Sequence, residues 1–488
     1  MTEALNKKVL LLFPPSINTI EPFKSAPKDQ YGIASGFPLG IGYVGAYLRE
    51  LGQYEVKIVD ALKQEMTIDD VIEVIDDYDP RYVGITVDTL SSKTAVALAK
   101  EIKNKWGDDK LVIAGGPHAS DDCDNLLTRY PFFDYLVIGE GEQTALELLQ
   151  ALDRNAENEL KDIEGLAFTD KKTGEIVKTP GRKLDRDLDT YPAPARDLVD
   201  MNEYIHRETV LPYAVEVMSS RGCTHRCVFC SFQRKWRPRS SEDIIKEVKG
   251  LIKEYPRIRS FAFLDDAFSV SKERVINFCK ALIDAGLENY MWSCSCRVDQ
   301  VDQEMIDWMK KAGCHKILYG LESADPQILK NLNKRIDPET AMRVIDMTTK
   351  AGIDIFVTLI VGNPGETHET LNTTYKFIKK LNCPAITWRV MNVYPGTALS
   401  KMQHHDDYVS YIYEPEVDDP SVYIAANIVA YEQNPGLDRE EQKRLCMVLT
   451  RKSVLYKMLT HPGYVIKKAY RMPRLAVRTF LRIFRLTK

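Results

Sequence analysis

The sequence has little of what marks membrane-spanning, repetitive or exported proteins. None of its hydrophobic runs reaches 18 uninterrupted apolar residues, so we expect no membrane-spanning helix. It contains no internal repeat and no low-complexity tract, which argues against a solenoid or an array. No apolar signal segment follows Met1, so we expect a cytoplasmic protein with reduced cysteines.

Neither sign of charge is in large excess. The 488 residues include 66 Lys and Arg against 70 Asp and Glu, a formal net charge of -4. The chain therefore lacks the general basic character of nucleic-acid-binding proteins, and we expect no nucleic-acid partner. With 44% hydrophobic residues, it has room for two or three globular domains.

Cysteines are scattered except at one place. Cys223, Cys227 and Cys230 lie within eight residues, and the aromatic Phe229 precedes the last of them. A structural zinc site would need four ligands, usually as paired half-sites, and no second Cys-x-x-Cys occurs. Three thiolates on one loop instead suit three irons of a [4Fe-4S] cluster whose fourth iron has no protein ligand. Three ordinary loop cysteines are the remaining alternative.

This Cys-x-x-x-Cys-x-x-Cys run resembles the signature of the radical S-adenosylmethionine (SAM) superfamily. The resemblance implies a [4Fe-4S] cluster on Cys223, Cys227 and Cys230, with the methionyl amino and carboxylate groups of SAM on the open iron. In that family an electron from the cluster cleaves SAM to a 5'-deoxyadenosyl radical. The chain would then be an oxygen-sensitive enzyme with an electron donor such as flavodoxin or ferredoxin.

The first 150 residues alternate short β-branched runs with amphipathic helix patterns, which predicts a doubly wound parallel α/β sheet. Expected strands cover residues 8–13, 55–60, 82–86, 111–114 and 135–138. A Gly-x-Gly-x-x-Gly run begins at Gly40, and Asp60 ends the next strand, as in nicotinamide-binding folds. However, roughly 26 residues separate Phe13 from Gly40, whereas that fingerprint should follow its strand directly. We therefore regard a nicotinamide site as the weaker interpretation.

The same segment resembles the Rossmann-like cobalamin-binding domain that precedes many radical SAM domains, through residues 38–43, 84–86, 115–119 and 139–142. Glycines at strand ends let the backbone approach a bulky ligand. The resemblance implies a cobalamin site that includes Thr86, Gly115, Gly116, His118, Gly139 and Glu140.

One cobalamin-binding pattern is absent from this sequence. Residues 1–117 contain no histidine, so the Asp-x-His-x-x-Gly run that ligates cobalt in one large class is missing. Either cobalamin binds without a histidine below cobalt, or the domain has lost cobalamin. His118 either faces the cofactor's tail or packs its own loop.

Beyond a polar, Pro-containing linker over residues 151–205, strand and helix patterns alternate again over residues 206–400 and predict a partial (β/α)6 radical SAM barrel. Barrel sites lie at the carboxyl ends of strands, where Arg297 suits the SAM carboxylate and Glu322 the ribose. The resemblance further implies Asp265 and Asp266 for the amino group, Glu322 and Ser323 for the ribose, Ile360, Gly362 and Pro364 beside the adenine, and Tyr394 in a closing loop. Structural ion pairs or helix caps are the alternative for each.

The segment 401–488 is expected to be a helical C-terminal region that ends in a basic amphipathic tail. From His461 onward the chain has eight Lys or Arg and no acid, interleaved with apolar and aromatic residues. This pattern fits a helix on an anionic lipid surface, a helix docked on the barrel, or less well a nucleic-acid contact. Membrane contact would make a lipid-soluble substrate such as a polycyclic isoprenoid or a tetrapyrrole plausible.

These patterns predict a cobalamin-dependent radical SAM enzyme that methylates an unactivated carbon. The rival is an anaerobic radical cyclase or ring-rearranging enzyme acting on a tetrapyrrole or isoprenoid lipid, since the chain resembles the anaerobic Mg-protoporphyrin monomethyl ester cyclase and hopanoid branch. A non-catalytic metal-binding module is the alternative from another class.

Overall fold

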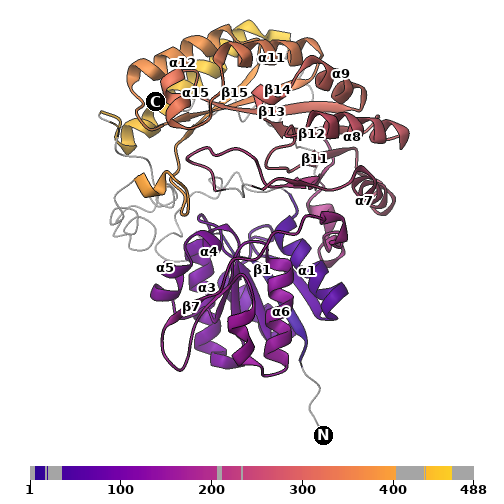
Figure 1. Cartoon of the computed structure of the whole chain (residues 1–488), viewed down its shortest axis with the longest axis vertical. Helices are drawn as coiled ribbons and strands as arrows, with labels where there is room; N and C mark the ends of the chain where they lie inside the picture. Colours follow the sequence, from indigo (N-terminus) through magenta and orange to yellow (C-terminus); the bar gives the residue numbers. More distant parts are fainter. Residues whose placement is uncertain are drawn as a thin grey trace. The chain divides into compact units, whose positions relative to one another are not determined.

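The computed structural model describes residues 6–16, 19, 36–205, 211–231, 235–402, 434 and 436–463. The chain folds into two compact units (Figure 1). Unit 1 comprises Met1–Tyr204 with Tyr394–Val429, and unit 2 comprises Ile205–Val393 with Ala430–Lys488.

Unit 1 contains a seven-stranded sheet in the order β2-β1-β3-β4-β5-β6-β7. Strands β1 to β5 are parallel, which confirms the predicted doubly wound sheet. Up to the last helix of this part, the elements are β1 (Lys8–Phe13), α1 (Leu39–Gly52), β2 (Glu55–Asp60), α2 (Ile68–Tyr78), β3 (Tyr82–Thr86), α3 (Ser92–Trp106), β4 (Leu111–Gly115), α4 (Pro117–Asp121), α5 (Cys123–Arg129), β5 (Tyr135–Val137) and α6 (Gly141–Asp153).

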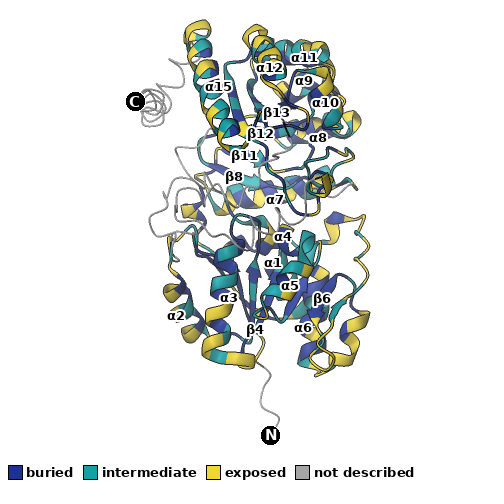
Figure 2. Ribbon diagram, turned by 90° about the vertical axis from the view of Figure 1, so that its left-hand side faces the viewer, coloured by how far each residue is buried: buried dark blue, intermediate teal, exposed yellow. Residues whose placement is uncertain are grey.

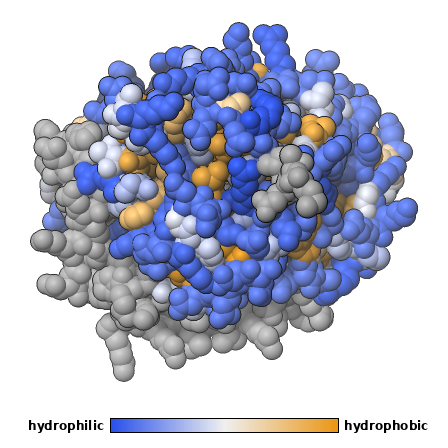
Figure 3. Space-filling model, turned by 90° about the horizontal axis from the view of Figure 1, so that it is seen from below, coloured by the Kyte–Doolittle hydropathy of each residue, from blue (hydrophilic) through white to orange (hydrophobic). Residues whose placement is uncertain are grey.

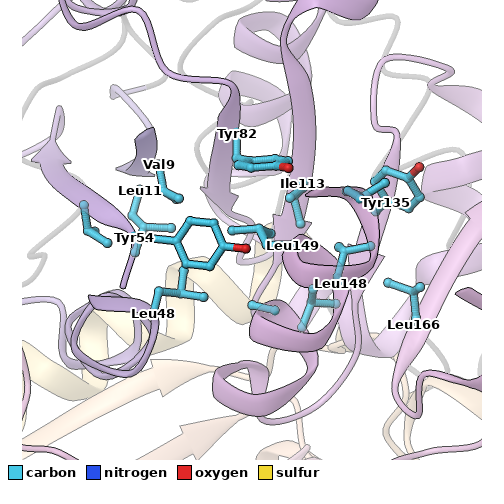
Figure 4. Packing of buried hydrophobic residues seen from close by; sticks show 14 of the residues in the cluster. Val9, Leu11, Leu48, Tyr54, Tyr82, Ile113, Tyr135, Leu148, Leu149 and Leu166 are labelled. Atoms are coloured by element: carbon cyan, nitrogen blue, oxygen red, sulfur yellow. The ribbon is translucent and has the colours of Figure 1, made fainter. Parts of the chain in front are cut away.

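Alternate residues of β1 enter two hydrophobic layers, because successive side chains of a strand point to opposite faces. Val9 and Leu11 pack with residues of α1 and α6 in one layer (Figure 4). Leu10 and Leu12 pack with residues of α2 and α3 in the other. A sheet covered on both faces has apolar residues at consecutive positions, which explains why this strand reads as a continuous hydrophobic run.

Two short strands within residues 151–205, a range expected to be a linker, extend this sheet. Strands β6 (Leu166–Thr169) and β7 (Ile176–Lys178) add to it in antiparallel orientation. Leu166 and Ala167 are fully buried. The sequence pattern did not predict these strands, because their apolar runs are only three and two residues long and are followed by charged or polar residues.

Unit 2 contains a six-stranded sheet in the order β15-β14-β13-β12-β11-β8, in which all five neighbouring pairs are parallel. This arrangement confirms the predicted partial barrel. The elements are β8 (Ala214–Val217), β9 (Ser220–Arg221), β10 (Arg237–Pro238), α7 (Ser241–Glu254), β11 (Ser260–Phe263), α8 (Lys272–Asp284), β12 (Met291–Cys296), α9 (Gln303–Lys311), β13 (Cys314–Glu322), α10 (Pro326–Asn331), α11 (Pro338–Lys350), β14 (Asp354–Val361), α12 (His368–Lys380), β15 (Ala385–Val390) and α15 (Arg439–Thr460).

Helix α15 covers the edge strand β15. Trp388 Nε1 donates a hydrogen bond of 3.0 Å to Ser453 Oγ, and Lys457 Nζ donates one of 2.5 Å to the Leu381 carbonyl. Other positions of α15 are exposed (Figure 2). Within the described residues, no helix combines the length and the apolar character needed to cross a membrane. The predicted basic tail from residue 464 onward lies outside the described residues.

Cys294 and Cys296 lie on one face of β12, as the sequence predicts for residues two apart. Both are buried, and their sulfur atoms lie 3.6 Å apart. They belong to the same side of the strand as Trp292, which packs against Phe268 and Phe278. Burial raises the pKa of the Cys294 thiol, which favours packing over metal ligation.

Candidate active site

The three clustered cysteines lie in the loop between β9 and β10, directly after the first strand of the barrel sheet. None of the three forms a disulfide with another described cysteine, and Cys227 is buried whereas Cys223 and Cys230 are partly exposed. In the described part of the chain, no three His, Cys, Asp or Glu side chains converge on a single ion. A [4Fe-4S] cube does not require such convergence, because each thiolate binds a different iron.

Two sulfur atoms of this loop accept hydrogen bonds. The backbone N–H of His225 lies 3.5 Å from Cys223 Sγ, and Arg297 Nη1 lies 3.9 Å from Cys227 Sγ. Hydrogen bonds to the sulfurs are a recurring feature of protein-bound iron–sulfur clusters. The three clustered thiols, their loop and these donors therefore fit a three-cysteine cluster.

Asp265 and Asp266 hold the beginning of this loop. Asp265 accepts hydrogen bonds from the backbone N–H and hydroxyl of Ser219, at 2.7 and 2.6 Å, and from the Ser220 hydroxyl at 2.6 Å. Asp266 Oδ2 accepts one of 2.8 Å from the N–H of Gly222. Both carboxylates therefore bind the protein itself in this structure. Their predicted contact with the SAM amino group stays a prediction.

Glu322 ends β13 in a strained conformation, with a φ of 66°. Its Oε1 accepts a hydrogen bond of 2.9 Å from Lys334 Nζ, and both side chains are buried. A Cβ atom on Gly320 would lie only 2.5 Å from Glu322 Oε1, so glycine makes room for the carboxylate. Strain of this kind gathers at functional sites. Ser323, the other predicted ribose contact, is fully buried and pairs with Thr374 Oγ1 at 3.1 Å.

The loop after β14 contains the predicted adenine-side residues. Gly362 has a φ of 94°, and its N–H donates to Glu366 Oε2 at 2.6 Å. Burial raises the pKa of Glu366 to about 7. The Ile360 carbonyl accepts from Asn363 Nδ2 at 2.9 Å, and the Pro364 carbonyl accepts from an asparagine of α10 at 2.8 Å. The loop is thus fixed by hydrogen bonds at each predicted position.

Tyr394, the predicted closing residue, belongs to unit 1 rather than to the barrel. The described residues after it pack there: a Cβ atom on Gly396 would lie 2.8 Å from Asp121 Cγ, at the end of α4. The expected barrel boundary at residue 400 therefore lies too far along the chain. Tyr394's contact with SAM stays a prediction.

The predicted cobalamin residues lie at the carboxyl ends of three adjacent strands of unit 1. Thr86 pairs with Gly115 at the ends of β3 and β4. Gly116 has a φ of 101°, and a Cβ atom there would lie 2.9 Å from the Val87 carbonyl, so only glycine suits the turn. Gly139, with a φ of 82°, follows β5 and donates to Ser120 Oγ at 2.9 Å. Glu140 follows at the N-cap of α6.

His118 points into the protein rather than away from it. Its side chain is buried, and Nδ1 lies 3.3 Å from Thr89 Oγ1. Burial lowers the pKa of His118, which favours the neutral imidazole. These contacts favour the loop-packing alternative.

Sequence reasoning missed several polar residues near these sites. Burial lowers the pKa of Lys93, at the beginning of α3, to about 7 and raises that of Asp121 to about 6. In unit 2 it missed Lys334 and Glu366. No local motif marks these two residues of unit 2, because Lys334 binds Glu322 from another segment and Glu366 accepts hydrogen bonds within its own turn.

The comparisons with known proteins match both halves of the chain. Residues 217–378 match the Radical SAM superfamily, and residues 34–149 match the B12 binding domain. Uncharacterized methyltransferase PH0819 of Pyrococcus horikoshii is 36% identical over 80% of this chain and 82% of its own length. The chain belongs to the radical SAM superfamily. Within it, the chain is in the group that also carries a B12-binding domain.

Other relatives share less of the sequence. The anaerobic magnesium-protoporphyrin IX monomethyl ester cyclase of Rubrivivax gelatinosus is 29% identical over 74% of this chain and 65% of its own length. Two solved structures share the fold. OxsB has a TM-score of 0.70 at 17% identity, and the match covers 98% of this chain and 75% of OxsB. TsrM of Kitasatospora setae has a TM-score of 0.66 at 20% identity, and the match covers 88% of this chain and 86% of TsrM.

The two matched families identify the cofactors of this chain. The enzyme uses a [4Fe-4S] cluster and SAM in its radical SAM domain and cobalamin in its B12-binding domain. Like other radical SAM enzymes, it acts on a small-molecule substrate and takes electrons from an external donor. The non-catalytic alternative is thereby removed.

Proposed function

We propose that this radical SAM enzyme transfers a methyl group to an unactivated carbon in a cobalamin-dependent reaction. The observation that carries the proposal is the joint presence of a B12-binding domain and a three-cysteine radical SAM loop in one chain. The archaeal relative named as a methyltransferase supports it. When bound, SAM and the cluster supply a 5'-deoxyadenosyl radical for hydrogen abstraction, and cobalamin supplies the methyl group.

The chain's own residues would bind and orient the cofactors and keep water out of the site. Cys223, Cys227 and Cys230 would hold the cluster. The Glu322 carboxylate would accept the ribose hydroxyls of SAM, and the rigid loop at Gly362 would lie along the adenine. In unit 1, the glycines at the ends of β4 and β5 would let backbone approach cobalamin. Fixed loops suit a reaction whose rate depends on alignment of reacting atoms.

The test is anaerobic reconstitution with iron, sulfide and hydroxocobalamin, followed by incubation with methyl-deuterated SAM, a low-potential reductant and candidate methyl acceptors. We expect co-purifying corrinoid, 5'-deoxyadenosine and a deuteromethylated product by mass spectrometry. Cys227→Ala should abolish deoxyadenosine, whereas Cys446→Ala, on α15, should not. Deoxyadenosine and a rearranged product without deuterium would contradict methyl transfer.

That outcome would favour the second candidate, an anaerobic radical cyclase or ring-rearranging enzyme on a tetrapyrrole or isoprenoid lipid. Its support is the relative named as a magnesium-protoporphyrin ester cyclase. The two candidates share hydrogen abstraction, so only the fate of the methyl group separates them.

We also propose peripheral contact with an anionic membrane and a lipid-soluble substrate, with flavodoxin or ferredoxin as the electron donor. Residues 442–488 contain 13 Lys or Arg and no Asp or Glu, and anionic headgroups attract such a segment. On α15, Leu455 and Leu459 are 50% and 74% exposed. Exposed leucines beside cations suit the boundary between headgroups and acyl chains.

A further inference from the structure

Arg297 lies at the carboxyl end of β12 with its guanidinium engaged by the protein. Nε and Nη2 each donate to one oxygen of the Asp299 carboxylate, both at 2.9 Å. Nη2 also donates to the Lys334 carbonyl at 2.5 Å, and Nη1 lies 3.9 Å from Cys227 Sγ. The side chain is only 10% exposed. Protein groups therefore already bind the guanidinium in this structure, and its predicted contact with the SAM carboxylate stays a prediction.

The turn that contains Lys334, whose carbonyl accepts the hydrogen bond from Arg297, also holds the cysteine loop. The Leu332 carbonyl accepts from the N–H of Val228 at 3.1 Å, and Asn333 Nδ2 donates to the Arg226 carbonyl at 2.8 Å. Asn333 has a left-handed backbone, with a φ of 51°. Cys227 therefore lies in a loop that is fixed on both sides, and its sulfur stays beside the guanidinium.

We propose that Arg297 is a positioning residue that raises the reduction potential of the cluster. Reduction adds one electron, from the external donor, to a cluster whose charge is shared with its thiolates. A cation that donates to the Cys227 sulfur stabilises the reduced cluster more than the oxidised one. Because the guanidinium is buried, water screens it little. Asp299 opposes this effect, since its carboxylate partly neutralises the same guanidinium.

The proposal rests on the cluster but not on methyl transfer. It is tested with full-length reconstituted protein by redox titration in the absence of SAM, with the reduced cluster followed by electron paramagnetic resonance. Arg297→Gln should lower the equilibrium constant for reduction about tenfold, which is about 59 mV for one electron. Asp299→Asn should shift the midpoint in the opposite direction. Lys330→Met removes an exposed cation on α10 and should leave the midpoint unchanged.

A second measurement separates this role from SAM binding. If Arg297→Gln keeps the wild-type midpoint but binds SAM at least tenfold more weakly by calorimetry, Arg297 serves the SAM carboxylate and the proposal is overturned. If Arg297→Gln does not retain iron, Asp299→Asn decides. A wild-type midpoint in Asp299→Asn would overturn the proposal, and a higher midpoint would support it. A wild-type protein that shows the cluster signal but no methylated product would count against methyl transfer alone.

Discussion

Asp266 Oδ2 accepts a hydrogen bond of 2.8 Å from the backbone N–H of Gly222, the residue just before the first cluster cysteine. Gly222 has a φ of 82°, a conformation that most side chains disfavour. The carboxylate thus fixes the turn from which the cysteine loop departs. Its role in the folded protein is to place Cys223, whatever it contacts when SAM is bound.

We expect Asp266→Ala to impair cluster assembly more than folding. The change leaves one backbone N–H without its acceptor, which costs about 1–3 kcal/mol if the group stays buried, and it releases the turn before Cys223. Iron and sulfide per chain after reconstitution should fall by half or more. Asp284→Ala, an exposed position at the end of α8, should reconstitute like the wild type. Full iron content in Asp266→Ala would show that Gly222 holds the turn without the carboxylate.

Lys334→Met should destabilise the apoprotein, because it leaves the Glu322 carboxylate buried without its cation. Breaking a buried pair from one side costs about 3–5 kcal/mol. In a unit of this size that corresponds to a fall in melting temperature of roughly 6–20 °C. The double variant Glu322→Gln, Lys334→Met should regain much of the loss, since no uncompensated charge remains.

The control for this pair is Lys330→Met, which removes an exposed lysine four residues away and should melt like the wild type. A single variant and a double variant with equal melting temperatures would mean that Glu322 finds another partner. Thr358 Oγ1, 3.4 Å from Glu322 Oε2, is the nearest described candidate.

The stability of unit 2 should depend on pH through Glu366. Burial raises the pKa of this carboxyl from 4.5 to about 7. Between these two values the folded protein holds a proton that the unfolded chain has lost, so stability falls as the pH rises from about 4.5 to about 7 and is constant above that. The total is on the order of 3 kcal/mol.

Glu366→Gln should remove this slope, because the amide does not titrate. Melting temperatures of the apoprotein should be measured from pH 5 to pH 8. The melting temperature of the wild type should fall toward neutral pH relative to that of the variant. Glu369→Gln, an exposed position on α12, should keep the wild-type profile. Parallel profiles for Glu366→Gln and the wild type would mean that the carboxyl titrates near its ordinary pKa.

Local patterns predicted the fold and the cluster cysteines, because both depend on short-range regularities. The continuous apolar run of β1 and the partly alternating pattern of β13 are both patterns that predict strands, and Cys223, Cys227 and Cys230 form one short motif. Arg297 was expected from the same strand-end logic, yet its partners were not. Asp299 is two residues away, whereas Cys227 and Lys334 come from other segments that only the folded chain brings together.

The errors share a physical cause. Strands β6 and β7 are too short to show a period, and they belong to the sheet because an open edge at β5 accepts them. Tyr394 ends a series of strand-end residues in the sequence, but its segment packs beside Asp121 in unit 1. In both cases the packing brings together segments that are separate in the sequence, and local patterns do not encode it. Figure 3 shows a mostly hydrophilic face with small hydrophobic patches. Composition alone does not predict where such patches lie, because tertiary packing decides which side chains reach the surface.

The proposed membrane contact should depend on the exposed leucines of α15 as well as on the basic residues. We expect the full-length protein to co-sediment with vesicles that contain phosphatidylglycerol but weakly with phosphatidylcholine alone, and added salt should release it, because surface charges are screened. Leu455→Ser with Leu459→Ser should weaken binding at least threefold by removing apolar area from the acyl boundary. Leu51→Ser, which changes a leucine that is 54% exposed in unit 1, should bind like the wild type. Equal binding to both kinds of vesicle, or loss of binding in Leu51→Ser alone, would place the contact elsewhere or exclude it.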